Sequence, residues 1–209
     1  VICWLGTRLK FRRKVIATAT VYFKRFYVKC VNPWLASATV LYLASKIEES
    51  TARVQDILNE LKKKHGEVAG VDAFTDRLVL ECELVVLETL HFDLIVFHPY
   101  RPLQQYLLDV NLGSDVLQSA WSIVNDSYRL DVCLLCPPYV IALAAVYLAC
   151  AYMGRDITDW FEKLNVNRKE VNDVVQQLLA MYKAATAKDD TSVDDLVAVL
   201  EPMCPRPAV

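Results

Sequence analysis

The chain has 209 residues, 55% of them hydrophobic and 23% charged, with a formal net charge of −2 and an isoelectric point near 6.0. This length allows one large domain or two small ones, with enough chain to bury a core. The charge balance excludes a general electrostatic attraction to nucleic acid. Because residue 1 is valine and the chain starts inside a helical pattern, we expect it to lack its native N-terminus.

Glycine and proline punctuate the sequence and predict an all-α fold. All five glycines and all eight prolines fall between periodic segments, and almost no alternating strand pattern occurs. The last helix of the first half is expected to turn Leu78, Cys82, Val85, Val86 and Thr89 inward and to carry Glu83 on an exposed face. The first half is predicted to form helices at residues 2–8, 11–28, 33–49, 51–64 (capped by Ser50) and 73–90.

The second half follows a rigid proline-containing turn at residues 98–102. We expect an N-terminal domain at residues 1–97, a C-terminal domain at 98–188 and a short tail at 189–209. The second half is predicted to form helices at residues 103–110, 114–129, 138–153, 156–164 and 167–185, with a short acidic helix at 189–201.

The stretch from Pro33 carries no charge up to Ser45 and then ends in Lys46, Glu48 and Glu49. A helix that is apolar all round belongs in the middle of a helical bundle, and proline suits its first turn. The sequence therefore predicts a buried central helix that delivers one amine and two carboxylates to a surface.

The same pattern recurs 105 positions later, from Pro138 to Cys150. A repeat at this distance indicates two copies of one helical unit rather than a solenoid. The second copy has Ala151 where the first has Lys46, so the shared residues are expected to build the core. The difference marks where function should be sought.

A pair of cysteines and a long uncharged stretch are better explained by packing in the core than by metal binding, redox chemistry or a membrane span. Cys133 and Cys136 form a CxxC, but no histidines are spaced to complete a zinc site, and the βαβ context of a redox motif is missing.

The 22 residues from Val132 to Met153 carry no charge. However, Pro137 and Pro138 leave a helix of about 15 residues, too short for a hydrocarbon core of about 30 Å. We expect buried thiols, no metal, no cofactor and no membrane span.

Motifs of catalysis are missing from the sequence, which has no GxxxxGK[ST], GxGxxG, HExxH or GxSxG. The three histidines do not stand in a triad-like order with a nucleophile. The absence of these motifs from the sequence therefore favours an adapter or regulator over an enzyme.

Several segments resemble the cyclins. The first cyclin box is matched by VIATATVYFKRF at residues 15–26, LASKIEE at 43–49 and LECEL at 80–84. HPYRPL at 98–103, IVND at 123–126 and WFEKL at 160–164 narrow the resemblance to the Mediator-associated cyclin C family. The resemblance extends to about residue 182 and is weakest across 51–76 and in the tail.

The resemblance implies two tandem five-helix cyclin folds, with the family's N-terminal helix truncated. It also implies a nuclear, non-catalytic subunit that binds and activates a cyclin-dependent kinase in transcription, with Mediator subunits as further partners. Lys46 and Glu83 match the family's paired contacts to the kinase helix that bears the catalytic glutamate. Replacing either with alanine is expected to weaken kinase binding and leave the melting temperature nearly unchanged.

Three further residues are candidates for the kinase interface. Glu48 and Glu49 follow Lys46 after one intervening residue. Glu49 is a candidate to stand in for a phosphate among arginines of the kinase activation segment, and the alternative is a solvated charge at the end of the helix. Arg12 lies in the basic turn before the helix at residues 11–28, with Lys10, Arg13 and Lys14. It is a candidate contact to an acidic part of the same segment, although a solvated basic turn is the favoured explanation of these charges.

Three alternatives remain open at this stage. The first is another transcriptional cyclin, of the H, K or T type. The second is a general transcription factor of cyclin-like fold that binds DNA, which the isoelectric point near 6.0 disfavours. The third is a scaffold that binds no kinase.

Overall fold

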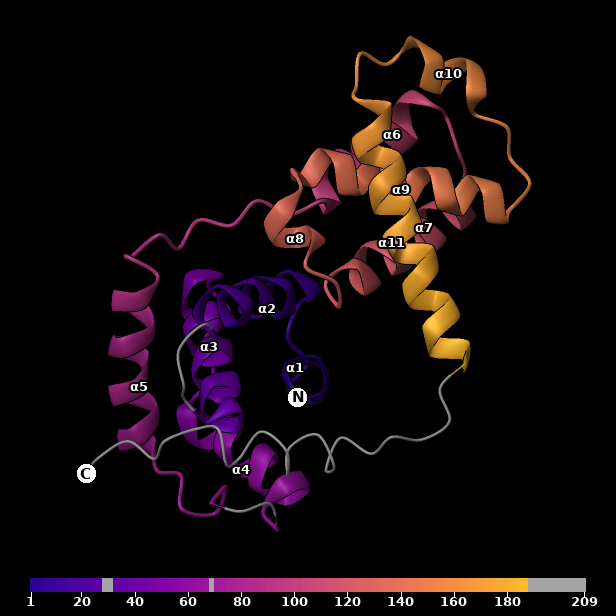
Figure 1. Ribbon diagram of the computed structural model, residues 1–209. Helices are drawn as coiled ribbons and strands as arrows, with labels where there is room; N and C mark the ends of the chain where they lie inside the picture. The colour runs from indigo at the N-terminus through magenta and orange to yellow at the C-terminus, as the bar shows by residue number, and fades with distance from the viewer. Residues whose placement is uncertain (28–31, 68–69, 188–209) are drawn as a thin grey trace. The chain divides into compact units, whose positions relative to one another are not determined.

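The computed structural model describes residues 1–27, 32–67 and 70–187 (Figure 1). These residues form helices and no strands, which confirms the predicted all-α class. Among the described residues, those up to Val96 make one compact unit, and residues 97–187 make a second. The helices are α1 (Ile2–Arg8), α2 (Arg13–Phe26), α3 (Pro33–Ile47), α4 (Val54–His65), α5 (Asp76–Thr89), α6 (Tyr100–Asp109), α7 (Ser114–Ser127), α8 (Val132–Leu135), α9 (Pro138–Tyr152), α10 (Thr158–Lys163) and α11 (Arg168–Ala187).

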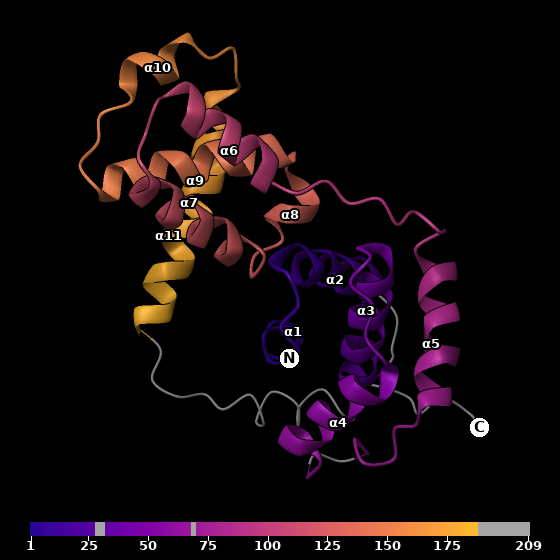
Figure 2. The same ribbon diagram turned by 180° about the vertical axis from the view of Figure 1, so that it is seen from behind.

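The first unit is built around α3, which packs against α1, α2, α4 and α5. Its side chains are buried on every side, as expected for a helix without a polar face. Asn32 caps its start by accepting hydrogen bonds from the N–H groups of Trp34 and Leu35 at 2.9 and 3.4 Å. Two views of the unit place α1 and α5 on opposite sides of α3 (Figures 1 and 2).

The second unit repeats this arrangement around α9. That helix contacts α6, α7, α8 and α11, and it also begins with a proline in its first turn. No helix among the described residues is both long and apolar enough to cross a membrane. The four-residue α8 was not predicted, and the acidic helix predicted at 189–201 lies outside the described residues.

The largest differences from the predicted helix bounds, three residues each, are at the starts of α4, α5 and α6. Helix α6 begins at Tyr100, inside the turn predicted at residues 98–102. Helix α4 begins after Arg53 rather than Ser50, and α5 begins after Thr75, whose hydroxyl accepts the N–H of Leu78 at 3.3 Å. The predicted inward face of α5 is wrong at two positions, since Leu78 and Val85 are 39% and 46% exposed. Apolar residues surround most of α5, so its hydrophobic pattern does not define one face.

Tyr22 joins α2 to the segment that follows α5. Its ring is fully buried, and its hydroxyl donates a hydrogen bond to the carbonyl of Leu94 at 2.6 Å. Burial, and next the charge of Glu48, raise the pKa of Tyr22 to about 12. The folded state therefore favours the neutral phenol, whose pKa in an unfolded chain is about 10.

We expect the stabilisation by Tyr22 to be complete below about pH 10 and lost as the pH rises to about 12. Urea unfolding at several alkaline pH values will measure this loss. A Tyr22→Phe variant should lose stability less steeply over the same interval, because phenylalanine has no hydroxyl to ionise. Equal slopes for both proteins would contradict the assignment.

Candidate functional site

Lys46 and Glu83 form an ion pair in the first unit. Lys46 lies in the last turn of α3 and Glu83 in the middle of α5, and the ammonium of Lys46 contacts Oε1 of Glu83. The Glu83 side chain is only 8% exposed, whereas that of Lys46 is 38% exposed. The pair thus places a buried carboxylate behind an ammonium that still faces solvent. The expectation from the sequence that Glu83 lies on an exposed face is wrong.

The ammonium of Lys46 is also held by its own helix. Tyr42 lies one turn earlier, and its ring centroid is 4.6 Å from Nζ of Lys46, which is a cation–π distance. Glu83 Oε1 is buried, and the Lys46 ammonium is the group that faces it. Two contacts therefore orient an amine that has further N–H donors to offer.

Exposed apolar side chains surround this ion pair. Leu80, Glu83, Leu84 and Leu87 share one face of α5 by their spacing of three and four residues. Leu80 is 44% and Leu84 67% exposed, and Ile47, directly after Lys46, is 41% exposed. A partly covered charge pair bordered by exposed leucines is typical of a protein interface rather than of a catalytic site.

Glu48 points into a different network, between the end of α3 and the start of α2. Its Oε2 lies 2.6 Å from the ammonium of Lys14, and its Oε1 accepts a hydrogen bond from the hydroxyl of Thr18 at 2.8 Å. The Glu48 side chain is 11% exposed, and Thr18 is fully buried. Within this unit, Glu48 therefore ties two helices together.

Glu49 and Arg12 both lie on the surface of the first unit. Glu49 has a positive φ of 51°, and its N–H bonds to the carbonyl of Lys46 at 3.2 Å as α3 ends. Arg12 precedes α2, and its carbonyl accepts the N–H of Val15 at 3.0 Å. The structure thus leaves both side chains exposed and brings neither into the Lys46–Glu83 pair.

The second unit lacks the ion pair at the equivalent positions. Aligning the buried residues of α5 and α11 pairs Val79, Cys82 and Val86 with Val171, Val174 and Leu178. In this register Glu83 corresponds to Val175, and the repeat of α3 in α9 pairs Lys46 with Ala151. Both charges of the pair are therefore replaced by apolar residues, so the second unit repeats these helices without the ion pair.

The cysteines of the described residues are free thiols, and Cys3 is exposed, so the expectation of buried thiols is wrong at that position. Burial raises the pKa of the Cys82, Cys136 and Cys150 thiols, which disfavours the reactive thiolate. Cys133 donates a weak hydrogen bond to the Leu130 carbonyl at 3.7 Å. Within the described residues, no three side chains of His, Cys, Asp or Glu gather as metal ligands would.

Family models match both units of the chain. The cyclin N-terminal domain matches residues 1–95, and the cyclin C-terminal domain matches residues 98–188. The chain belongs to the cyclin family. Among related proteins, Cyclin-C of Rattus norvegicus is 40% identical over 99% of this cyclin and 77% of the relative. Cyclin-C of Drosophila melanogaster is 42% identical over 99% of this cyclin and 80% of the relative.

Solved structures share the fold of this cyclin. A chain in the crystal structure of the yeast RNA Pol II CTD kinase complex CTDK-1 matches with a TM-score of 0.74 and 19% identity, over 98% of this cyclin and 74% of that chain. A chain of the CAK complex from Chaetomium thermophilum bound to ATP-γ-S matches with a TM-score of 0.67 and 22% identity, over 88% and 60% of the two chains. At these identities the likeness establishes the architecture, two tandem cyclin boxes.

Proposed function

We propose that this cyclin is the regulatory subunit of a cyclin-dependent kinase that acts in transcription, within the nuclear Mediator kinase module. The observation that carries the proposal is the half-buried Lys46–Glu83 ion pair among exposed leucines, at positions where the second unit has Ala151 and Val175. The related proteins named Cyclin-C and the kinase complexes among the structural relatives support it.

The proposed mechanism follows from what a protein kinase requires. A kinase is active only when its catalytic lysine is paired with a glutamate on a movable helix. The Lys46 ammonium would donate hydrogen bonds to that helix, while Glu83 and Tyr42 keep the amine in place. The exposed leucines of α5 would cover the apolar side of the same helix. The cyclin would supply position and no catalytic group.

Glu49 is proposed to act on the kinase activation segment in place of a phosphate. Its exposed carboxylate follows Lys46 by three residues, and its backbone is held in the left-handed region. Glu49→Gln is expected to lower the turnover of an unphosphorylated kinase about tenfold, because a charge-assisted hydrogen bond is worth about 1.5–3 kcal/mol. Steady-state phosphorylation assays measure this, with Glu162→Gln in the second unit as a control. An unchanged turnover with Glu49→Gln would contradict the proposed role of Glu49.

The proposed function itself is tested by purification of the tagged cyclin from nuclear extract, followed by mass spectrometry. Recovery of a Mediator-associated kinase together with Mediator subunits is the expected result. Recovery of the kinase of CTDK-1 or of the CAK complex would assign another transcriptional cyclin instead. A gel shift with duplex DNA and no associated kinase would favour the DNA-binding alternative.

A further inference from the structure

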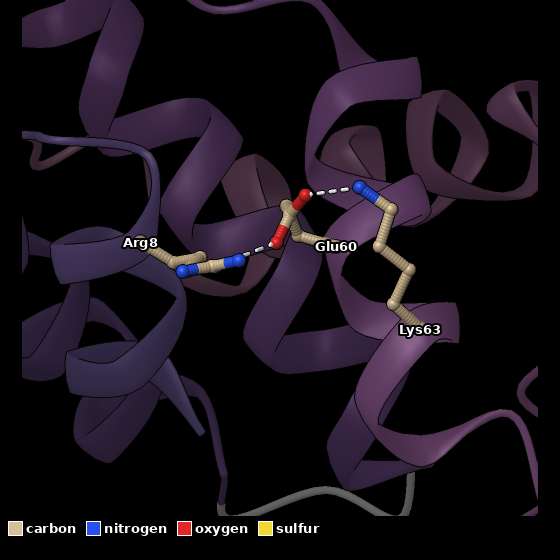
Figure 3. A network of polar contacts seen from close by, with 3 residues as sticks. All are labelled: Arg8, Glu60 and Lys63. Atoms are coloured by element: carbon tan, nitrogen blue, oxygen red, sulfur yellow. Dashed lines mark hydrogen bonds and ion pairs between the residues drawn. The ribbon is translucent and has the colours of Figure 1, made fainter.

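Two contacts close the first unit over its helices. Between α1 and α4, Arg8 and Lys63 hold the two oxygens of Glu60, at 3.2 and 2.5 Å (Figure 3). On α2, the hydroxyl of Tyr22 donates its hydrogen bond to the carbonyl of Leu94, in the segment that follows α5. Leu94 also packs against the core of the unit, so this segment covers the buried ring of Tyr22.

An apolar groove lies at the equivalent place in the second unit, where α7 and α11 both pack on α9. Its volume of about 740 Å³ is typical of binding clefts, and all three helices supply its apolar lining: Ile123, Leu148, Ala149 and Leu179. Aligning α2 and α7, which both have 14 residues, pairs Tyr22 with Ile123. The alignment of α5 with α11 pairs Leu87 with Leu179. The groove therefore lies where the segment after α5 covers the first unit.

The groove stays open because the chain leaves the two units differently. After α5, His91 and Phe92 have positive φ angles of 51° and 57°, and the chain turns back over α2. In the second unit, α11 continues through Tyr182, which is the equivalent of Leu90, and ends only at Ala187. Within the described part of the second unit, the groove is therefore left uncovered.

Residues 188–209 lie outside the described part of the chain, and their sequence matches the groove in character. Their apolar side chains fall on one face of a helix by their spacing of three and four residues: Val193, Leu196, Val197 and Leu200. Ser192 followed by Asp195 forms a capping box that predicts the helix start, and Pro202 predicts its end. The short acidic helix predicted here thus has an apolar face of about two turns.

The length of this segment allows it to reach the groove. Helix α11 rises about 7.5 Å from Tyr182 to its last residue, Ala187, whereas residues 188–193 span up to about 20 Å when extended. A tether this short gives the segment an effective concentration of about millimolar beside the groove. Weak contacts are therefore enough to hold it there.

The charges favour the same placement. Residues 189–201 carry five carboxylates and no cation. The edge of the groove carries Arg155, which is 60% exposed and follows the lining residue Tyr152 by three positions, and the exposed Lys183, which follows Tyr182. Arg155 lies 3.9 Å from Asp115, at the limit of an ion pair, so this contact offsets its charge only in part.

We propose that residues 193–201 bind the groove as a helix and cover the second unit as the segment after α5 covers the first. Leu196 and Leu200 fill the space between Leu148 and Leu179, and the carboxylates lie toward Arg155. A helix of a partner protein, or a second copy of the chain, reaches the groove only by displacing a segment that is already tethered beside it.

Hydrogen–deuterium exchange of the full chain, measured by mass spectrometry, tests this proposal. In the wild type, the protection factors of the amides at residues 196–201 should be at least about tenfold higher than in the double variant Leu196→Ser/Leu200→Ser. The same variant should also speed exchange at the end of α9, residues 148–152. The control Ala198→Ser/Val199→Ser changes residues outside the apolar face and should exchange like the wild type.

A groove variant provides the second arm of the test. Ala151→Trp fills the groove from α9 and leaves residues 193–201 unchanged, and it should lower their protection by a similar factor. Circular dichroism melting establishes that each variant is folded. Equal protection in the wild type and in Leu196→Ser/Leu200→Ser, or an equal loss in the control, would overturn the proposal. Protection that rises with protein concentration would assign the segment to a second copy, and protection that survives Ala151→Trp would place it elsewhere, so either result also overturns it.

Discussion

Replacing Lys46 with alanine is expected to weaken kinase binding by at least about 30-fold, corresponding to a loss of about 2–5 kcal/mol. The substitution removes the donor that faces the kinase helix and leaves Glu83 without its partner. Because the Glu83 side chain is 8% exposed, the unpaired carboxylate should also lower the free energy of unfolding, by about 1–3 kcal/mol. Binding is measured by titration with the purified kinase and stability by urea unfolding.

This expectation differs from the one drawn from the sequence, in which the melting temperature stays nearly unchanged. Glu83→Gln, alone and combined with Lys46→Ala, completes a double-mutant cycle, and the combination should lose less stability than the sum of its parts. Lys64→Ala is a matched control, since Lys64 also lies over an aromatic ring, at 4.4 Å from its centroid. Wild-type kinase affinity in Lys46→Ala would remove both residues from the interface.

Replacing Leu84 with glutamine is expected to weaken kinase binding at least about tenfold and to leave stability within about 0.5 kcal/mol of the wild type. Leu84 is 67% exposed, so the folded protein gains little from its apolar surface until a partner covers it. Isothermal titration with the kinase, alongside urea unfolding of the free cyclin, measures the two quantities separately.

Leu135 provides the comparison for Leu84. It is 76% exposed in the second unit, on the short α8, and Leu135→Gln should leave kinase binding unchanged. If both variants bind the kinase as the wild type does, the exposed face of α5 is not the interface. If both weaken it equally, the interface is not confined to the first unit.

Much of the fold follows from the sequence because its strongest signals are local. Pro33 and Pro138 each open an uncharged helix, and a helix without a polar face has only the interior in which to lie. The repeat between these helices, with Ala151 in place of Lys46, also directs attention to the first unit. The resemblance to cyclins then pairs Lys46 with Glu83, and the structure shows the two side chains in contact.

The sequence by itself determined the two central helices, the doubled architecture and the difference between Lys46 and Ala151 at the end of the repeat. Each of these features depends on a run of adjacent residues. Only the tertiary structure decided the faces of α5 and the roles of the acidic residues. Leucines and valines lie on most sides of α5, so its hydrophobic periodicity does not define a buried face. Packing against α3 determines that Glu83 is buried and Leu84 is exposed. The adjacent residues Glu48 and Glu49 differ in their contacts for the same reason. Glu48 pairs with Lys14 and accepts a hydrogen bond from Thr18, both distant in the chain, whereas Glu49 stays exposed.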